Sequence, residues 1–198
     1  MIIRLAFFEI SALPEDLTDL IAALPFGEDD RARLRAIKND ASLRHSLAAR
    51  MALRSLCQDG GVIARTEHGK PYFSEDGAPC FSLSHAGGLA VAACSDEPCG
   101  VDLEAFREKL DTQALSKRFF SKEDQASLNS HGDFLTLWTR KEAIAKCLGK
   151  PLPELLGKEI ALPTRTFREG NFTVTLAAER EFSVEFSPQS TRFQEVLL

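Results

Sequence analysis

One stretch near the middle of the chain, residues 89–104, limits the fold more than any other. It begins with LAVAAC, a short apolar run of small residues that is typical of a buried strand. A turn sequence, SDEPCG, separates this run from VDLE. Because successive side chains of a strand point to opposite faces, Asp102 and Glu104 share one face, and Val101 and Leu103 share the other. The stretch therefore predicts a hairpin whose second strand presents two carboxylates side by side.

The patterns on either side of this stretch divide the chain into two halves. We expect a strand at 2–10, a short helix between Pro14 and Pro25, a long helical region at 28–57, turns at 68–88, mostly helix at 105–129, a helix from an Asp133 cap to about Leu148, and two or three strands in 158–198. Each half thus offers strands and one long helix. The sequence predicts an α+β fold with an antiparallel sheet in each half, divided into residues 1–97 and 98–198.

Composition excludes several classes of protein. A net charge of −5 and a pI near 5.5 argue against a general nucleic-acid binder, which needs excess Lys and Arg to pair with phosphates. No apolar run approaches the length of a membrane span, and the N-terminal segment lacks the features of a signal peptide. The five cysteines show no CxxC spacing, which favours reduced thiols. We therefore expect a soluble cytoplasmic protein.

A third carboxylate and a lysine lie on the predicted helix near 133–148. Trp138, Glu142 and Lys146 follow one another at intervals of four residues along one stripe. Magnesium binds through a few carboxylates, water and substrate phosphates, so Asp102, Glu104 and Glu142 are candidate ligands. The residues alone also fit a solvated strand face and an ordinary Glu–Lys surface pair.

These residues belong to a longer ordered series of motifs. The chain contains GKP at 69–71, FSLSH at 81–85, CGVDLE at 99–104, RFFSKED at 118–124, WTRKEAIAK at 138–146 and KCLGK at 146–150. Over about residues 40–160 this series resembles the 4'-phosphopantetheinyl transferase superfamily, of the two-half type that activates surfactin synthetase. The acidic G-x-D-x-E motif followed by W-x-x-K-E-x-x-x-K is the specific part of the resemblance.

The resemblance implies a pseudo-twofold fold that binds coenzyme A in the cleft between two similar halves. It assigns Asp102, Glu104 and Glu142 to Mg²⁺ and places Lys146 beside the pyrophosphate. The remaining carried-over contacts to coenzyme A are Ser84 and His85 at its phosphates, Lys70 and Pro71 at its adenine end, and Arg44 as a candidate for its 3′-phosphate. Pro151 departs from the family, which usually has a glycine there.

The implied reaction is magnesium-dependent transfer of 4′-phosphopantetheine from coenzyme A to a serine of an acyl or peptidyl carrier protein, which releases adenosine 3′,5′-bisphosphate. Glu142 is the candidate base for the serine proton, and Lys146 stabilises the leaving oxygen. The family is also expected to act as a monomer.

Carrier proteins are acidic, and residues 105–122 are basic. This segment holds five basic residues against two acidic ones, a net of +3. Lys117, Arg118, Phe119 and Phe120 are candidate contacts, because cations beside aromatic rings suit a small protein interface. The alternative is that the phenylalanines belong to the core.

Two other functions stay open. A module that binds coenzyme A or a carrier protein without turnover would keep the same residues. A magnesium nuclease also uses carboxylates and a lysine, but there the lysine normally follows a metal-binding acid by two residues on one strand. Here Ala105 and Phe106 follow Glu104.

Overall fold

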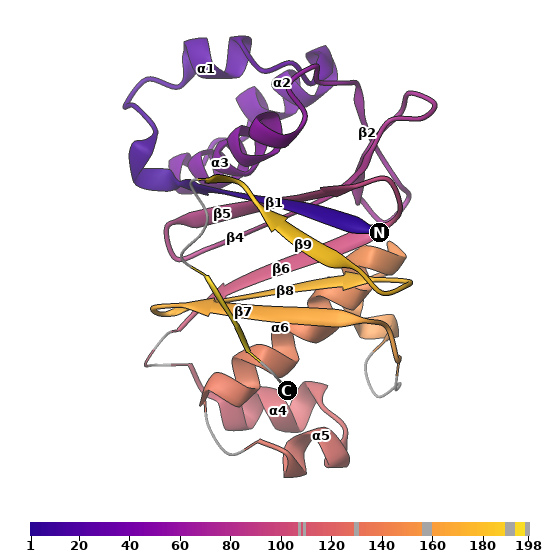
Figure 1. The fold of residues 1–198 in the computed structure, drawn as a ribbon. Coiled ribbons are helices and arrows are strands. Elements are labelled where there is room, and N and C mark those ends of the chain that lie inside the picture. The colour runs from indigo at the N-terminus through magenta and orange to yellow at the C-terminus, as the bar shows by residue number, and fades with distance from the viewer. Residues whose placement is uncertain (107, 109, 129–130, 156–159, 189–192, 197–198) are drawn as a thin grey trace.

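Two four-stranded sheets pack face to face between two layers of helices (Figure 1). The computed structural model describes residues 1–106, 108, 110–128, 131–155, 160–188 and 193–196. One apolar core, which includes Leu5, Val91, Val101 and Leu176, fills the space between the sheets. A second core lies between the first sheet and the N-terminal helices, and a third lies under the long C-terminal helix. The predicted α+β class is confirmed.

The first sheet has the strand order β4-β5-β1-β9. Its strands are β1 (Ile2–Glu9), β4 (Cys80–Ala86), β5 (Leu89–Ser95) and β9 (Ser183–Phe186). β4, β5 and β1 are antiparallel, but β9 runs parallel to β1, with Ile2 opposite Ser183. The first sheet is therefore mixed rather than antiparallel as predicted. β9 follows the predicted boundary between residues 97 and 98 in the sequence, but it belongs to the first sheet.

The second sheet has the order β10-β7-β8-β6 and is antiparallel throughout. Its strands are β6 (Cys99–Ala105), β7 (Thr164–Glu169), β8 (Phe172–Ala178) and β10 (Gln194–Val196). The predicted hairpin of β5 and β6 is therefore wrong. β5 already pairs with β4 on one edge and β1 on the other, so no edge is left for β6, which pairs with β8 instead.

The helices fall into an N-terminal group and a C-terminal group. They are α1 (Thr18–Ala22), α2 (Gly27–Ala36), α3 (Asp40–Leu56), α4 (Thr112–Phe119), α5 (Lys122–Ala126) and α6 (His131–Leu148), with 3₁₀ turns at Ile10–Ala12 and Leu152–Glu154 and a small ribbon of β2 (Ile63–Arg65) and β3 (Pro71–Phe73). None of the described helices is long and apolar enough to cross a membrane.

Four sequence predictions about the elements need correction. The expected helix at 28–57 is two helices, because the Asn39 side chain accepts from the Ser42 amide at 2.8 Å and caps a new start. α6 begins at His131, so Asp133 lies in its first turn and is not its cap. The segment after 158 holds four strands rather than two or three, and 68–88 contains β3 and β4 as well as turns.

A buried ion pair joins α2 to α3. Arg50 donates to both oxygens of Asp30, at 2.7 and 3.1 Å, and Asp30 is 1% exposed. A bidentate pair of this kind satisfies both charges away from water. Arg50 is therefore a packing residue of the N-terminal layer.

Candidate active site

Three polar side chains from three different elements meet on the helix-facing side of β6. Ser84 of β4 donates to Asp102 Oδ1 of β6 at 2.9 Å. Lys146 of α6 donates to the same oxygen at 2.7 Å and to Ser84 Oγ at 3.0 Å. Asp102 and Ser84 are buried, so these bonds form away from bulk water. The structure brings together three of the residues that the motifs single out.

Alternation along β4 explains how Ser84 reaches this point. Phe81 and Leu83 pack with the N-terminal helices, whereas Ser82 and Ser84 face β6. Ser82 Oγ accepts the Val101 amide at 3.0 Å and links β4 to β6 although the two strands lie in different sheets. FSLSH is thus a strand with a period of two and not a turn.

His85 points to the opposite face of β4 from Ser84. Its ring lies 4.9 Å from the ring of His45 on α3, measured between centroids. Neighbouring atoms desolvate the ring, although much of the residue stays open to solvent, and His45 and Lys146 add positive charge. These effects lower the pKa of His85 below its ordinary value. Ser84 and His85, which the motif predicts as a pair, therefore lie on opposite faces of β4: Ser84 contacts Asp102 and His85 contacts His45.

Gly100 lets α6 lie directly on β6. A Cβ atom at this position would be 1.9 Å from the carbonyl oxygen of Ala143 and 2.5 Å from the amide nitrogen of Cys147. Only a residue without a side chain permits this approach. Asp102 follows two residues later on the same face of the strand, so the contact sets Lys146 and Glu142 against it. Gly100 belongs to the CGVDLE motif, but its role in packing was not predicted.

The acidic groups of the site are under electrostatic stress. Burial raises the pKa of Glu142, the negative charge of Asp102 raises it further, and Lys146 opposes both effects. Asp102 Oδ2 is buried and, among the described residues, has no hydrogen-bond partner. Glu104 lies two residues along β6 on the same face and is half-buried. Within the described ranges, no three His, Cys, Asp or Glu side chains are grouped closely enough to hold a metal ion.

Buried threonines hold α6 against the second sheet beside these carboxylates. Thr139 of α6 and Thr175 of β8 have hydroxyls 2.7 Å apart, and Thr166 of β7 lies 2.9 Å from Thr175. Thr175 is opposite Asp102 in the β6–β8 register, and Thr139 precedes Glu142 by three residues. The hydroxyl chain therefore fixes the rotation of α6 at the point where it presents Glu142.

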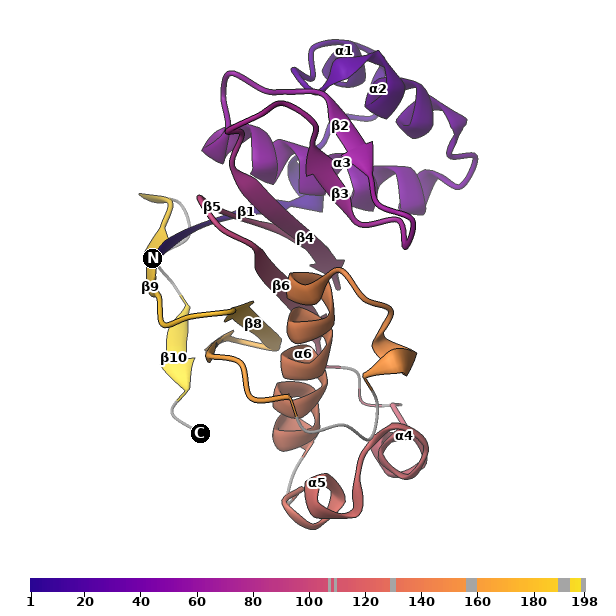
Figure 2. The ribbon, with the colours of Figure 1, turned by 90° about the vertical axis from the view of Figure 1, so that its right-hand side faces the viewer.

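A cavity of about 250 Å³ opens beside Lys146. The segment before β3, strand β4 and the C-terminal end of α6 surround it, and Figure 2 shows that segment next to the end of α6. Lys70, Lys146 and Lys150 all line the cavity, together with Pro71. Three lysines around one cavity in a chain of net charge −5 make it a local site for an anion. Lys150 was not predicted; its spacing of four residues from Lys146 was the available signal.

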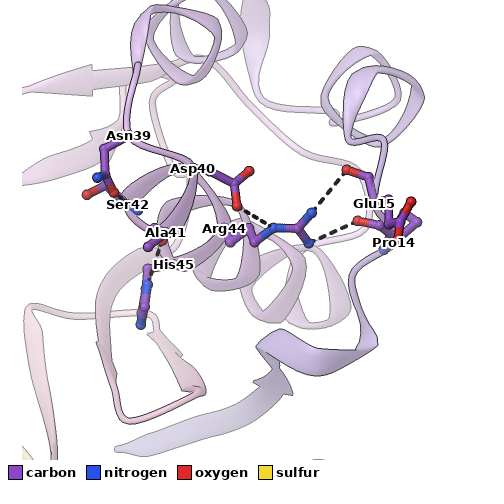
Figure 3. A network of polar contacts seen from close by, with 8 residues as sticks. All are labelled: Pro14, Glu15, Asn39, Asp40, Ala41, Ser42, Arg44 and His45. Carbon is purple, nitrogen blue, oxygen red and sulfur yellow. Dashed lines mark hydrogen bonds and ion pairs between the residues drawn. The ribbon is translucent and has the colours of Figure 1, made fainter.

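Two predicted cofactor contacts also make bonds within the protein. Lys70 Nζ donates to the carbonyl oxygen of Cys147 at 3.2 Å and bridges the β3 segment to the end of α6. Arg44 donates to Asp40 at 2.9 Å and to the carbonyls of Pro14 and Glu15 at 3.0 Å each (Figure 3). Arg44 thus ties α3 to the segment before α1.

The residues predicted to contact the carrier protein are partly exposed and partly buried in the core. Lys117 and Arg118 on α4 are exposed, and Phe119 is half-buried with the Arg118 guanidinium 5.0 Å from its ring centroid. Phe120 is 6% exposed and packs with Phe134 and Trp138. Two further basic residues of the segment, Arg107 and Lys109, lie outside the described residues.

The fold and the site define a protein with a carboxylate–lysine cluster beside a lysine-lined cavity, in a mixed structure of two sheets that each carry helices. The sequence pattern of the 4'-phosphopantetheinyl transferase superfamily matches residues 98–196, half of the chain. The chain belongs to this superfamily.

Three curated relatives carry the same description. The chain is 30% identical over 125 residues to 4'-phosphopantetheinyl transferase AcpT of Salmonella typhimurium, which covers 60% of this chain and 65% of the relative. It is 34% identical over 110 residues to AcpT of Escherichia coli K12, covering 52% and 56%. It is 33% identical over 95 residues to 4'-phosphopantetheinyl transferase gsp of Aneurinibacillus migulanus, covering 45% and 38%. The chain therefore spans less than two thirds of the length of each of these relatives.

The close approach at Gly100 leads to a stability prediction. We expect Gly100→Ala to lower the free energy of unfolding by about 3 kcal/mol, because helix backbone occupies the place of the methyl group. Gly77→Ala is the matched control: its φ of +75° is strained for alanine, but no atom lies within 4 Å of the new Cβ, so we expect a loss of about 1 kcal/mol. Urea unfolding of both variants measures the difference, and equal losses would contradict the packing argument.

Proposed function

We propose that this protein transfers 4′-phosphopantetheine from coenzyme A to a serine of an acyl or peptidyl carrier protein and releases adenosine 3′,5′-bisphosphate. Membership of the superfamily and the relatives named as 4'-phosphopantetheinyl transferases support the reaction class. The observation that carries the proposal is the cavity lined by Lys70, Lys146 and Lys150 beside the carboxylates of Asp102 and Glu142. The lysines suit the negative charge of several phosphates, and the carboxylates suit the binding of a cation and the transfer of a proton.

The acidic residues fit a divalent cation. Asp102 Oδ2 is a buried oxygen without a hydrogen-bond partner among the described residues, and Asp102 raises the pKa of Glu142 by repulsion. A cation between these groups would satisfy the oxygen and relieve the repulsion. Asp102, Glu104 and Glu142 would hold Mg²⁺, and because the three side chains are not yet grouped closely enough for this in the structure, their carboxylates would have to turn toward the ion. When bound, Mg²⁺ supplies Lewis-acid stabilisation of pyrophosphate charge.

The residues of the chain then have separable tasks. The carrier serine oxygen attacks the β-phosphorus of coenzyme A, and the bond from that phosphorus to the adenosine bisphosphate oxygen breaks. Glu142 is the candidate base that accepts the serine proton, directly or through a water molecule. Lys146 neutralises negative charge on the leaving oxygen, from a position that Ser84 and Asp102 fix through hydrogen bonds.

Coenzyme A would lie along the cavity toward the N-terminal half. Ser84 and Lys146 are assigned to the pyrophosphate, His85 to a neighbouring phosphate, and Lys70 and Pro71 to the adenine end, with Lys150 as an added contact. A pseudo-twofold relation between residues 1–97 and 98–198 is part of this proposal. The two sheets, each with helices on its outer face, support it.

The carrier protein would dock on α4. Lys117 and Arg118 are exposed there and Phe119 is partly accessible, which suits an acidic partner. Phe120 belongs to the aromatic core between α4 and α6 and would orient this surface from below.

Mass spectrometry of an apo carrier protein tests the reaction. With coenzyme A and Mg²⁺ we expect the carrier to gain one phosphopantetheine, and chelation of the metal to stop the gain. Glu142→Gln and Lys146→Met should each slow the transfer about 100-fold or more, while Glu185→Gln on the exposed face of β9 should not. Binding of coenzyme A without a mass gain would mean a binding module, and cleavage of nucleic acid would mean a nuclease.

The Arg44 prediction calls for a pair of substrates. Because its guanidinium already binds Asp40, Pro14 and Glu15, we expect Arg44→Gln to lower the free energy of unfolding by about 1–2 kcal/mol. The predicted 3′-phosphate contact requires the KM for coenzyme A to rise more than the KM for 3′-dephospho-coenzyme A. Equal changes in the two KM values would contradict that contact.

Charge reversal tests the docking surface. The double variant Lys117→Glu, Arg118→Glu should raise the KM for the carrier protein by about 10-fold or more at low salt, with the KM for coenzyme A unchanged. Arg33→Glu on α2, at the far end of the molecule from α4, is the matched control (Figure 1). An unchanged KM for the carrier in the double variant would move the docking surface elsewhere.

A further inference from the structure

Two cysteines that are far apart in the sequence meet at the edge of the N-terminal layer. The sulfur atoms of Cys57 and Cys94 are 3.2 Å apart, although 37 positions separate the residues. Cys57 caps the C-terminal end of α3, and Cys94 lies on β5. Both are free thiols. Their contact comes entirely from the packing of α3 on the first sheet.

The surroundings distinguish the two sulfurs. Cys94 is completely buried, and Arg4, its partner across the β1–β5 register, approaches its sulfur at 3.9 Å. The hydrogen bond from Cys57 and the charge of Arg4 lower the pKa of Cys94 and outweigh its burial. The same hydrogen bond raises the pKa of Cys57, which is half-buried. Of the two thiols, Cys94 therefore loses its proton more readily.

Two other cysteines of the chain are in a different situation. Burial raises the pKa of Cys99 to about 12 and that of Cys147 to about 11. Both side chains are buried, at 0% and 3% exposure, whereas Cys57 is half-buried and accessible to a small oxidant. Position thus singles out Cys57 and Cys94, whose sulfurs also lie next to one another.

We propose that Cys57 and Cys94 form a modification site, at which a hydroperoxide converts the pair to an intramolecular disulfide. The sulfurs must approach by about 1 Å to reach bonding distance, which small rotations of the two side chains supply. The disulfide would clip the end of α3 to β5. This inference does not depend on the proposed transferase function.

The chemistry balances with hydrogen peroxide as the oxidant. Cys57, the more accessible thiol, attacks one peroxide oxygen; the O–O bond breaks, one water leaves and Cys57 becomes a sulfenic acid. Cys94 then loses its proton and attacks the Cys57 sulfur as a thiolate; the S–O bond breaks, and the leaving hydroxide takes up the proton from Cys94 and departs as a second water. Two thiols lose two electrons and two protons, and one peroxide becomes two waters. The raised pKa of Cys57 makes the first step the slow one.

Non-reducing mass spectrometry of the full chain tests the proposal. Treatment with hydrogen peroxide should lower the mass of the intact chain by about 2 Da, and two of its five thiols should then be protected from alkylation by N-ethylmaleimide after unfolding. Peptide mapping should identify the Cys57–Cys94 cross-link. Dithiothreitol should reverse the change, and the oxidised form should have a Tm higher by about 5–10 °C.

Cysteine variants provide the controls. Cys57→Ser should abolish the cross-link, whereas Cys80→Ser should leave it intact. Cys80 is a suitable control because it is half-buried, as Cys57 is, and close enough to Cys94 for the charge of Cys94 to raise its pKa. The map of the unmodified sequence decides the matter even where a variant folds poorly. A cross-link of Cys94 to Cys80, or irreversible oxidation of Cys57 with Cys94 still alkylatable after unfolding, would overturn the proposal.

Discussion

The contact of α6 with β6 at Gly100 is the constraint on which the rest of the site depends. Helix backbone lies where any side chain at Gly100 would stand, so the separation of helix and strand is fixed at its minimum. Lys146 then reaches Asp102 at 2.7 Å, and the hydroxyls of Thr139 and Thr175 meet at 2.7 Å nearby. A helix held one side-chain layer further away would break both contacts, because a hydrogen bond tolerates only a few tenths of an ångström.

The buried carboxylate of the site costs folding free energy, and packing gives no reason for its presence. A buried carboxylate costs free energy unless it is paired and fully hydrogen-bonded. Among the residues that the structure describes, Asp102 is paired through Oδ1 only, and its negative charge raises the pKa of Glu142. The apolar cores on both sides of the second sheet stabilise the fold and offset this cost. Local disagreement between a polar group and its surroundings is expected where a protein binds or transforms a ligand.

Local patterns predicted much of this structure, and long-range pairing escaped them. The alternation of VDLE placed Asp102 and Glu104 on one face, and the spacing of Glu142 and Lys146 placed both on one stripe of α6. That this stripe faces β6 comes from the structure. The hairpin of β5 with β6 was wrong because strand neighbours depend on which edges are already taken. The engagement of Arg44 by two backbone carbonyls and the meeting of Cys57 with Cys94 depend on segments about 30 and 37 residues away, for which periodicity contains no signal.

The parallel pairing of β9 with β1 has a consequence for how the chain assembles. The outer edge of β1 is covered only by β9, whose Ser183 pairs with Ile2 and follows it by about 180 residues. During synthesis β1 therefore leaves the ribosome with a bare edge, and that edge stays open to other strands until β9 has emerged. Closing so long a loop is slow, so the first sheet is completed late in folding. The pairing also joins the two halves, because a strand of the second half completes the sheet of the first.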